Sequence, residues 1–199
     1  MLFWYISLFF IALTLGLLDV SPIVTFAIIA IYIIVSTPFV IPIIWSKDTE
    51  KMKNYLKKSR NAYYKFLYRF LTGDYEEASM ITGNMRNGKM KDMANVMLFI
   101  HQKRHTEAKP ILEKMKESLF KNYYLAAVSC EEGNLEAYNT YKNNVRDSDY
   151  RKWLEVEEAV RAGGKVEALK MLDEQIGRLR GAKLLSAVHY RDELLKKKD

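Results

Sequence analysis

Four short blocks recur along the chain at an almost constant spacing. Each places Gly, Asn or basic residues a few positions before an alanine, and Ala78, Ala108, Ala137 and Ala168 lie 30, 29 and 31 residues apart. Helix-length apolar patterns flank each block, and strand-like alternation is absent. Repeats of this length are typical of solenoids, in which each unit buries its apolar face on its neighbours. The sequence therefore predicts an all-α fold, with about four helix pairs and a C-terminal capping helix over residues 61–199.

The residue types in the blocks suit a turn between paired helices. Gly and Asn let the chain leave one helix, and the small alanine lets the next helix pack closely. Large apolar residues precede the alanines at helical spacing, such as Phe66 and Phe70 in the first block and Trp153 and Val156 in the fourth. We expect helices over 48–72, 75–86, 89–102, 105–118, 120–131, 134–145, 148–162, 165–178 and 182–197. The last should cap the stack with Leu184, Leu185, Val188 and Leu195 facing the preceding pair.

These blocks resemble tetratricopeptide repeats. The strongest match is Trp153, Val156, Val160, Gly163 and Ala168, and Gly73 to Ala78 resembles the inter-helix turn of that family. The resemblance covers roughly residues 50–180. The period of about 30 is shorter than the family's 34, and the repeat-ending proline is missing. The resemblance implies a tetratricopeptide-like α-solenoid.

In the resembled family, the first helix of each pair lines a groove that binds an extended peptide or a partner helix. The resemblance places these residues in a partner-binding groove: Asn61, Tyr64, Tyr68, Lys91, Leu98, His101, Tyr123, Arg151, Glu158 and Arg161. Aromatic and Arg side chains dominate binding at many interfaces. Basic side chains outnumber acidic ones in this set, which would suit an acidic peptide tail or a C-terminal carboxylate.

The first 46 residues contain two long apolar runs, Met1 to Leu18 and Ile23 to Trp45, with no Lys or Arg. Their lengths, about 27 and 34 Å as helices, are close to a bilayer core. We expect a transmembrane hairpin over residues 1–46, with spans at about 1–18 and 23–45. A cleaved signal peptide and a buried core helix are less favoured alternatives. Pro38 and Pro42 should bend the second span or end it early.

Basic residues follow the second apolar run directly. We expect Lys47, Lys51, Lys53, Lys57, Lys58 and Arg60, in a helix start over 47–60, to face anionic lipid head groups. Basic residues beside a span mark its cytoplasmic end, so both termini of a two-span cell-membrane protein should be cytoplasmic. Trp4, Tyr5 and Trp45 should share one membrane interface. The composition suggests a bacterial source.

The net charge of +7 lies mostly in residues 47–70, whereas a nucleic-acid domain would carry it through its folded part. We therefore expect no nucleic-acid partner. The single Cys130 excludes an internal disulfide and argues against a Cys-based zinc site. His101 and His105 flank a predicted turn, so we expect neither a metal site nor a cofactor. No catalytic motif occurs, and we expect no enzyme activity.

These observations favour a membrane-anchored adaptor or scaffold that binds a partner protein at the cytoplasmic membrane face. The partner could be another membrane protein or one with an acidic tail. The main alternative is a small structural or accessory subunit of a larger membrane protein complex. A lipid-responsive factor acting through residues 47–69 is a further alternative, and an enzyme is the least favoured.

Overall fold

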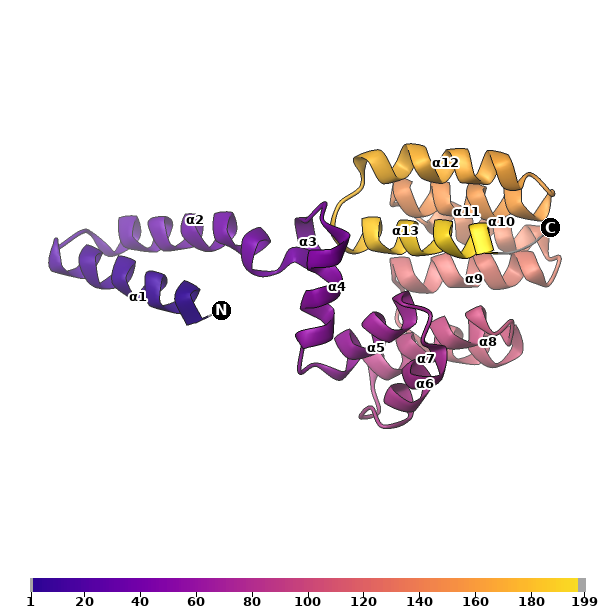
Figure 1. The fold of residues 1–199 in the computed structure, drawn as a ribbon, viewed down its shortest axis with the longest axis horizontal. Coiled ribbons are helices and arrows are strands. Elements are labelled where there is room, and N and C mark those ends of the chain that lie inside the picture. The colour runs from indigo at the N-terminus through magenta and orange to yellow at the C-terminus, as the bar shows by residue number, and fades with distance from the viewer. Residues whose placement is uncertain (1, 197–199) are drawn as a thin grey trace.

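The computed structural model describes residues 2–196, and over this range it contains helices and no strand (Figure 1). The all-α prediction is confirmed. The helices are α1 (Leu2–Leu17), α2 (Pro22–Val40), α3 (Pro42–Trp45), α4 (Thr49–Lys58), α5 (Ala62–Leu71), α6 (Tyr75–Gly83), α7 (Lys89–His101), α8 (His105–Lys114), α9 (Leu119–Glu131), α10 (Leu135–Asn144), α11 (Ser148–Arg161), α12 (Lys165–Arg178) and α13 (Gly181–Lys196). From α4 onward, consecutive helices pack on their neighbours, an arrangement compatible with a helical solenoid.

One turn geometry recurs between the paired helices. Gly73, Lys103, Gly133 and Gly163 follow one another at intervals of 30 residues, with φ of 79°, 58°, 71° and 82°. In each turn the next residue donates its backbone N–H to the carbonyl five positions back, at 2.9, 2.7, 2.9 and 2.8 Å. A left-handed residue with this hydrogen bond forms a Schellman motif, which ends a helix and satisfies its last carbonyls. The recurring block is thus one local backbone structure.

The pairs α5–α6, α7–α8, α9–α10 and α11–α12 bury the residues that the repeat predicts. Ala78, Ala108 and Ala168 are fully buried. The third pair departs from the pattern, because Ala137 is half-buried and the neighbouring Tyr138 is buried in its place. The third block therefore packs through a different residue from the other three.

The predicted helix over 48–72 is two helices, α4 and α5. The chain leaves α4 at Ser59 in an extended conformation. Asn61 then caps α5, because its side-chain oxygen accepts hydrogen bonds from the N–H groups of Tyr63 (2.9 Å) and Tyr64 (3.4 Å). A capping Asn offers the backbone an alternative to continuing the helix.

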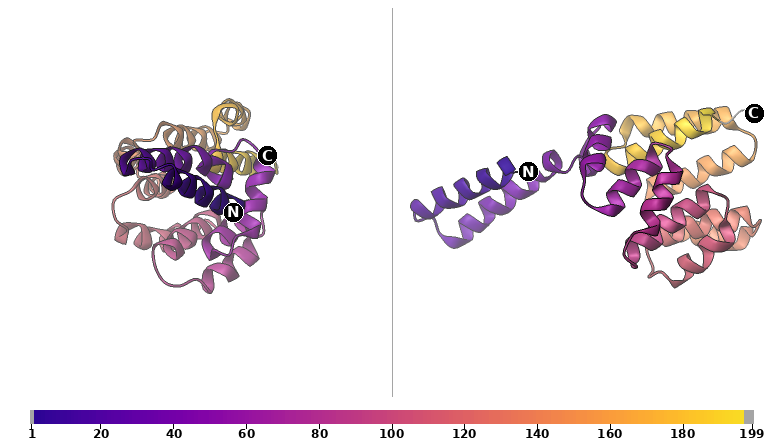
Figure 2. Two further views of the ribbon diagram at one scale, coloured as in Figure 1. Left: turned by 90° about the vertical axis from the view of Figure 1, so that its left-hand side faces the viewer. Right: turned by 60° about the horizontal axis from the view of Figure 1, so that its bottom comes forward.

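Helices α1 and α2 form a hairpin that extends away from the helical body (Figures 1 and 2). Trp4 Nε1 donates a hydrogen bond to Ser36 Oγ at 2.6 Å, and Ser7 and Tyr32 hydrogen-bond through their hydroxyls. The Trp4 and Tyr32 rings also stack, with centroids 6.3 Å apart. Trp4 therefore links α1 to α2, whereas Trp45 of α3 lies against Arg180.

The predicted transmembrane hairpin is wrong. Across residues 2–196, no helix combines the length and the apolarity that a membrane crossing requires. Helix α1 has 16 residues, about 24 Å, against a hydrocarbon core of about 30 Å. The second run continues through Pro38 but breaks at Ile41, where Pro42 begins the separate, four-residue α3. The predicted location, two spans with both termini cytoplasmic, depended on those spans and is wrong for the same reason.

The two ends of the helical body meet. The Gly181 N–H donates to the Ser46 carbonyl at 2.8 Å, and Lys47 Nζ lies 3.4 Å from the Gly177 carbonyl oxygen. Gly181 has φ +58°, and a Cβ there would collide with the carbonyl oxygens of Ile43 and Ile44. Glycine is thus required where α13 begins against α3. We call this junction between α3–α4 and α13 the closure.

Candidate interaction face

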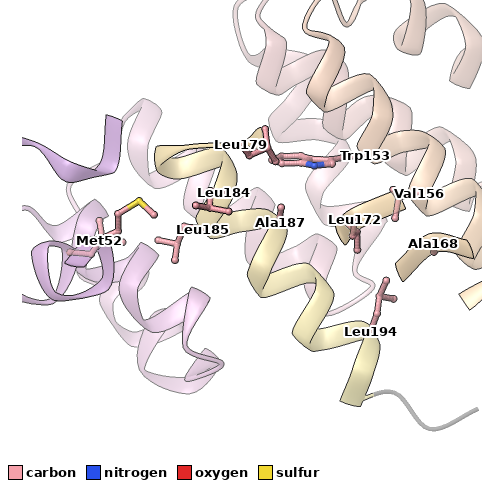
Figure 3. Packing of buried hydrophobic residues seen from close by; sticks show 11 residues of the cluster. Met52, Trp153, Val156, Ala168, Leu172, Leu179, Leu184, Leu185, Ala187 and Leu194 are labelled. Carbon is pink, nitrogen blue, oxygen red and sulfur yellow. The ribbon is translucent and has the colours of Figure 1, made fainter. Parts of the chain in front are cut away.

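Helix α13 packs against far more than the preceding pair. One buried cluster joins Met52 and Leu56 of α4, Trp153 and Val156 of α11, Ala168 and Leu172 of α12, and Leu179, Leu184, Leu185, Ala187 and Leu194 (Figure 3). Side chains of α5 and α9 also pack on it. We define the inner face as the side chains from the first helices of the pairs that belong to this cluster or pack on it: Tyr64, Leu67, Tyr68, Leu71, Tyr123, Tyr150, Trp153, Val156, Ala159 and Val160.

An ionic contact fixes the first half of α13. Lys183 Nζ lies 2.8 Å from Asp147 and 2.7 Å from Asp149, and 5.6 Å from the centre of the Tyr150 ring. Asp147 also caps α11, accepting hydrogen bonds from the N–H groups of Asp149 and Tyr150. Burial alone would raise the pKa of Asp147, but Lys183 and these N–H donors outweigh it and lower that pKa. The carboxylate therefore remains charged at neutral pH and holds α13 to α11.

A group of aromatic rings lies beside His189, where the second half of α13 begins. The His189 ring lies 5.8 Å from the Phe70 ring, and the His101 ring stacks on Tyr75 at 3.6 Å. Burial lowers the pKa of His189; Glu193 and Asp192 oppose that shift, while His101 and Lys196 reinforce it. Burial, together with the Glu193 carboxylate, raises the pKa of Tyr75. His189 therefore favours its neutral form in this position.

A second polar contact lies deeper on the inner face. Tyr123 Oη donates a hydrogen bond to Glu157 Oε1 at 3.0 Å, linking α9 to α11. Burial, followed by the charge of Glu157, raises the pKa of Tyr123 well above its ordinary value. Burial and Glu157 also raise the pKa of Tyr190 of α13. Both tyrosines remain protonated across the ordinary pH range, and Tyr123 donates to this carboxylate.

Three of the predicted groove residues lie on the inner face. Tyr64, Tyr68 and Tyr123 all pack on the cluster that includes α13. His101 lies beside the second half of α13, where it contacts Tyr75 and Phe70. The structure thus brings together the aromatic members of the predicted set, but places the chain's own helix against them.

The other predicted groove residues have different roles. Leu98 is buried against Phe66 and Ala78, between pairs. Asn61 caps α5. The remaining four make contacts at pair junctions: Lys91 with the Gly83 carbonyl (3.2 Å), Arg151 with the Val145 carbonyl (2.9 Å), Glu158 with Tyr138 and Lys142, and Arg161 with Glu131 (2.7 Å). Because Arg151 and Arg161 have internal partners, the groove offers less free positive charge to a partner than the sequence suggests.

The basic residues of 47–60 are distributed around α4. Lys53 pairs with Glu50 at 2.9 Å, and Lys57 Nζ lies 6.0 Å from the Tyr68 ring centre. The others, Lys47, Lys51, Lys58 and Arg60, are exposed. Their binding to anionic lipid head groups stays a prediction. Helix α4 itself packs on α13 through Met52 and Leu56, so this segment is part of the helical body.

The sequence interpretation missed the position of α13. It treated Trp153 as packing between paired helices and did not link this residue to the C-terminal helix. One available signal was the apolar pattern of α13, because Leu184, Leu185, Ala187 and Leu194 do not lie on one narrow stripe. A helix that is apolar on several sides is typically enclosed by neighbours. The predicted contact of Leu195 is also wrong: Leu195 is exposed, and Leu194 is buried.

Comparisons with protein-family models, with curated proteins and with solved structures gave no match.

Proposed function

We propose that the protein is a helical-repeat scaffold that binds a partner protein through its inner face. The observation that carries this proposal is the packing of a helix, α13, on aromatic side chains contributed by α5, α9 and α11. A face that accommodates one helix has suitable shape and chemistry for another. Tyr and Trp side chains supply large contact areas at low entropic cost, and they are common at the centres of interfaces.

The tetratricopeptide resemblance supports the same proposal at a finer level. The turns recur every 30 residues, and the first helices of the pairs contribute the inner face. In the resembled family the equivalent helices hold a peptide or a partner helix. A partner with an acidic tail is less well supported, because Arg151 and Arg161 already have internal partners.

Site-specific crosslinking in the full-length protein tests the proposal. A photoreactive phenylalanine analogue at His101 places the probe beside the inner face, and the same analogue at Leu135 on α10 provides the control. Leu135 is 67% exposed and lies on a second helix of a pair. We expect a discrete adduct in cells from position 101 and none from 135. Equal adducts at both positions, or none at either, would contradict the assignment.

A second candidate is a structural subunit of a larger protein complex. The α1–α2 hairpin favours it, since Phe9, Phe26 and Ile34 are 63%, 75% and 71% exposed. Contiguous apolar surface of this kind marks an interaction site. Phe9→Lys with Phe26→Lys should release the chain from a stable complex on native gels, while the far-UV helical signal persists. A complex of unchanged size would contradict this candidate.

A further inference from the structure

We propose that the second half of α13, residues 189–196, is a built-in occupant of the aromatic surface beside the inner face, formed by Phe70, Tyr75 and His101, and that an amphipathic helix of a partner replaces it. This inference rests on the proposed scaffold function and specifies both the partner's chemistry and its competitor. Residues 181–188 would remain in place during the exchange. The argument follows from how differently the two halves of α13 are held.

The first half is fixed at several independent points. Leu184, Leu185 and Ala187 are 5%, 1% and 1% exposed, in the cluster shared with α4 and α11. Lys183 bridges two carboxylates, and Gly181 lies directly against the backbone of α3. Moving this half would open the closure and expose the core beneath it. It is therefore a permanent part of the fold.

The second half of α13 has fewer buried side chains and ion pairs to the rest of the protein than the first half. Of residues 189–196, Leu194 alone is buried, and Leu195 is 51% exposed. The pair between Arg191 and Asp173 is at the surface, where ion pairs add little to stability. His189 and Glu193 occupy positions beside aromatic rings but are only partly buried. Leu194 is the one member of the main cluster in these turns, with Tyr190 packed against it, so their departure would remove a single buried side chain from that cluster.

The surface beneath the second half indicates what would replace it. Phe70, Tyr75 and His101 form a group of aromatic rings contributed by α5, α6 and α7. Helix α13 presents Tyr190 and Leu194 one turn apart, and His189 and Glu193 one turn apart beside them. A fitting partner segment is a helix with an aromatic residue followed four positions later by Leu, and with a carboxylate on the adjoining stripe. Such a helix would repeat the contacts that α13 now makes.

The test uses the full-length protein and a synthetic peptide of residues 186–199 as the probe. Occupancy by α13 lowers the apparent affinity for any competitor, because only the open fraction can bind. Tyr190→Ala with Leu194→Ala weakens the resident contacts, so we expect at least tenfold tighter peptide binding than the wild type. Leu195→Ala is the matched control and should bind as the wild type does. A peptide carrying the two alanines should bind neither protein.

Equal peptide affinity in the double variant and the wild type, with an unchanged helical signal, would overturn the inference. Hydrogen exchange of the wild type gives a second measurement that needs no variant. Residues 191–196 should exchange at least tenfold faster than the last two turns of α11, residues 154–161. Comparable protection would show that α13 is permanent throughout.

The two proposals can fail separately. A crosslink at position 101, combined with a negative peptide result, would leave a scaffold whose partner binds beside a permanent α13. Peptide binding without any crosslink in cells would instead support the exchangeable half of α13 and contradict the adaptor function.

Discussion

The four turns between paired helices and the closure between the two ends of the body are held in different ways. Each turn is completed within six residues by the same backbone hydrogen bonds, and it tolerates Lys103 where the others have Gly. The closure joins Ser46 to Gly181, segments more than 130 residues apart, and it depends on a glycine that nothing larger can replace. The turns therefore tolerate different residues at their left-handed position, whereas the contact between the two ends of the body depends on one residue, Gly181.

Substitution at Gly181 should produce the largest effect. Gly181→Val places a branched side chain at φ +58° and against two carbonyl oxygens. Left-handed strain and overpacking together should destabilise the protein by about 4 kcal/mol. Gly177→Val is the matched control, because Gly177 has open space around it, and it should change stability by less than about 0.5 kcal/mol. Urea denaturation measures both, and similar losses would show that the closure does not require a glycine.

The next effect concerns the apolar contact beside the closure. Leu185 is 1% exposed in the cluster shared by α4 and α11, so Leu185→Ala should cost about 3 kcal/mol. Leu195→Ala, on the same helix at an exposed position, should cost less than about 0.5 kcal/mol. Thermal denaturation should separate the two variants by several degrees. Coincident melting curves would mean that α13 contributes little to the core.

A smaller effect of opposite sign is expected at a turn. Lys103 is the non-glycine member of the four turn positions, with φ +58°. Lys103→Gly should stabilise the protein by about 1 kcal/mol by relieving left-handed strain. Gly133→Ala introduces the same strain into another turn and should destabilise by a similar amount. If both substitutions are neutral, the turns are less restrictive than their backbone angles indicate.

The smallest expected effect is a pH dependence at the second half of α13. Because the pKa of His189 is lowered on folding, the unfolded chain binds a proton more readily than the folded one. The contribution of His189 is complete above its ordinary pKa of 6.5 and is lost as the pH falls below it. The loss should be on the order of 1 kcal/mol or less, and His189→Gln should remove it. Denaturation between pH 7.5 and 5 measures the difference, and an identical slope in the variant would exclude His189 as its source.

Much of the helical body could be predicted from the sequence. The expected ranges 165–178 and 148–162 match α12 and α11 within a residue, because their ends depend on nearby glycines and caps. The helix over 48–72 was predicted too long, since the cap at Asn61 competes locally with a pattern that otherwise favours helix. For the candidate site, the register along the first helices selected Tyr64, Tyr68 and Tyr123, which lie on the inner face, but it also selected Leu98 and Lys91, which serve other contacts.

In the N-terminal region, apolar composition alone was not enough to predict the structure. Two apolar runs separated by a short link predicted two membrane spans, but the second run breaks before Pro42. The hairpin instead aligns Trp4 with Ser36 and Ser7 with Tyr32. The prolines in the second run indicated that it could end early, and it does so at Ile41, directly before Pro42.

By itself, the sequence determined the all-α class, the 30-residue period and the positions of the turns, because each of these depends on residues a few positions apart. Only the tertiary structure decided that the two ends meet and that α13 lies on the inner face. That contact depends on the summed rotation of all the stacked pairs, to which every repeat contributes and which no local pattern encodes. The candidate site therefore combines aromatic residues that the repeat register indicated with an occupant that only the folded chain brings to them.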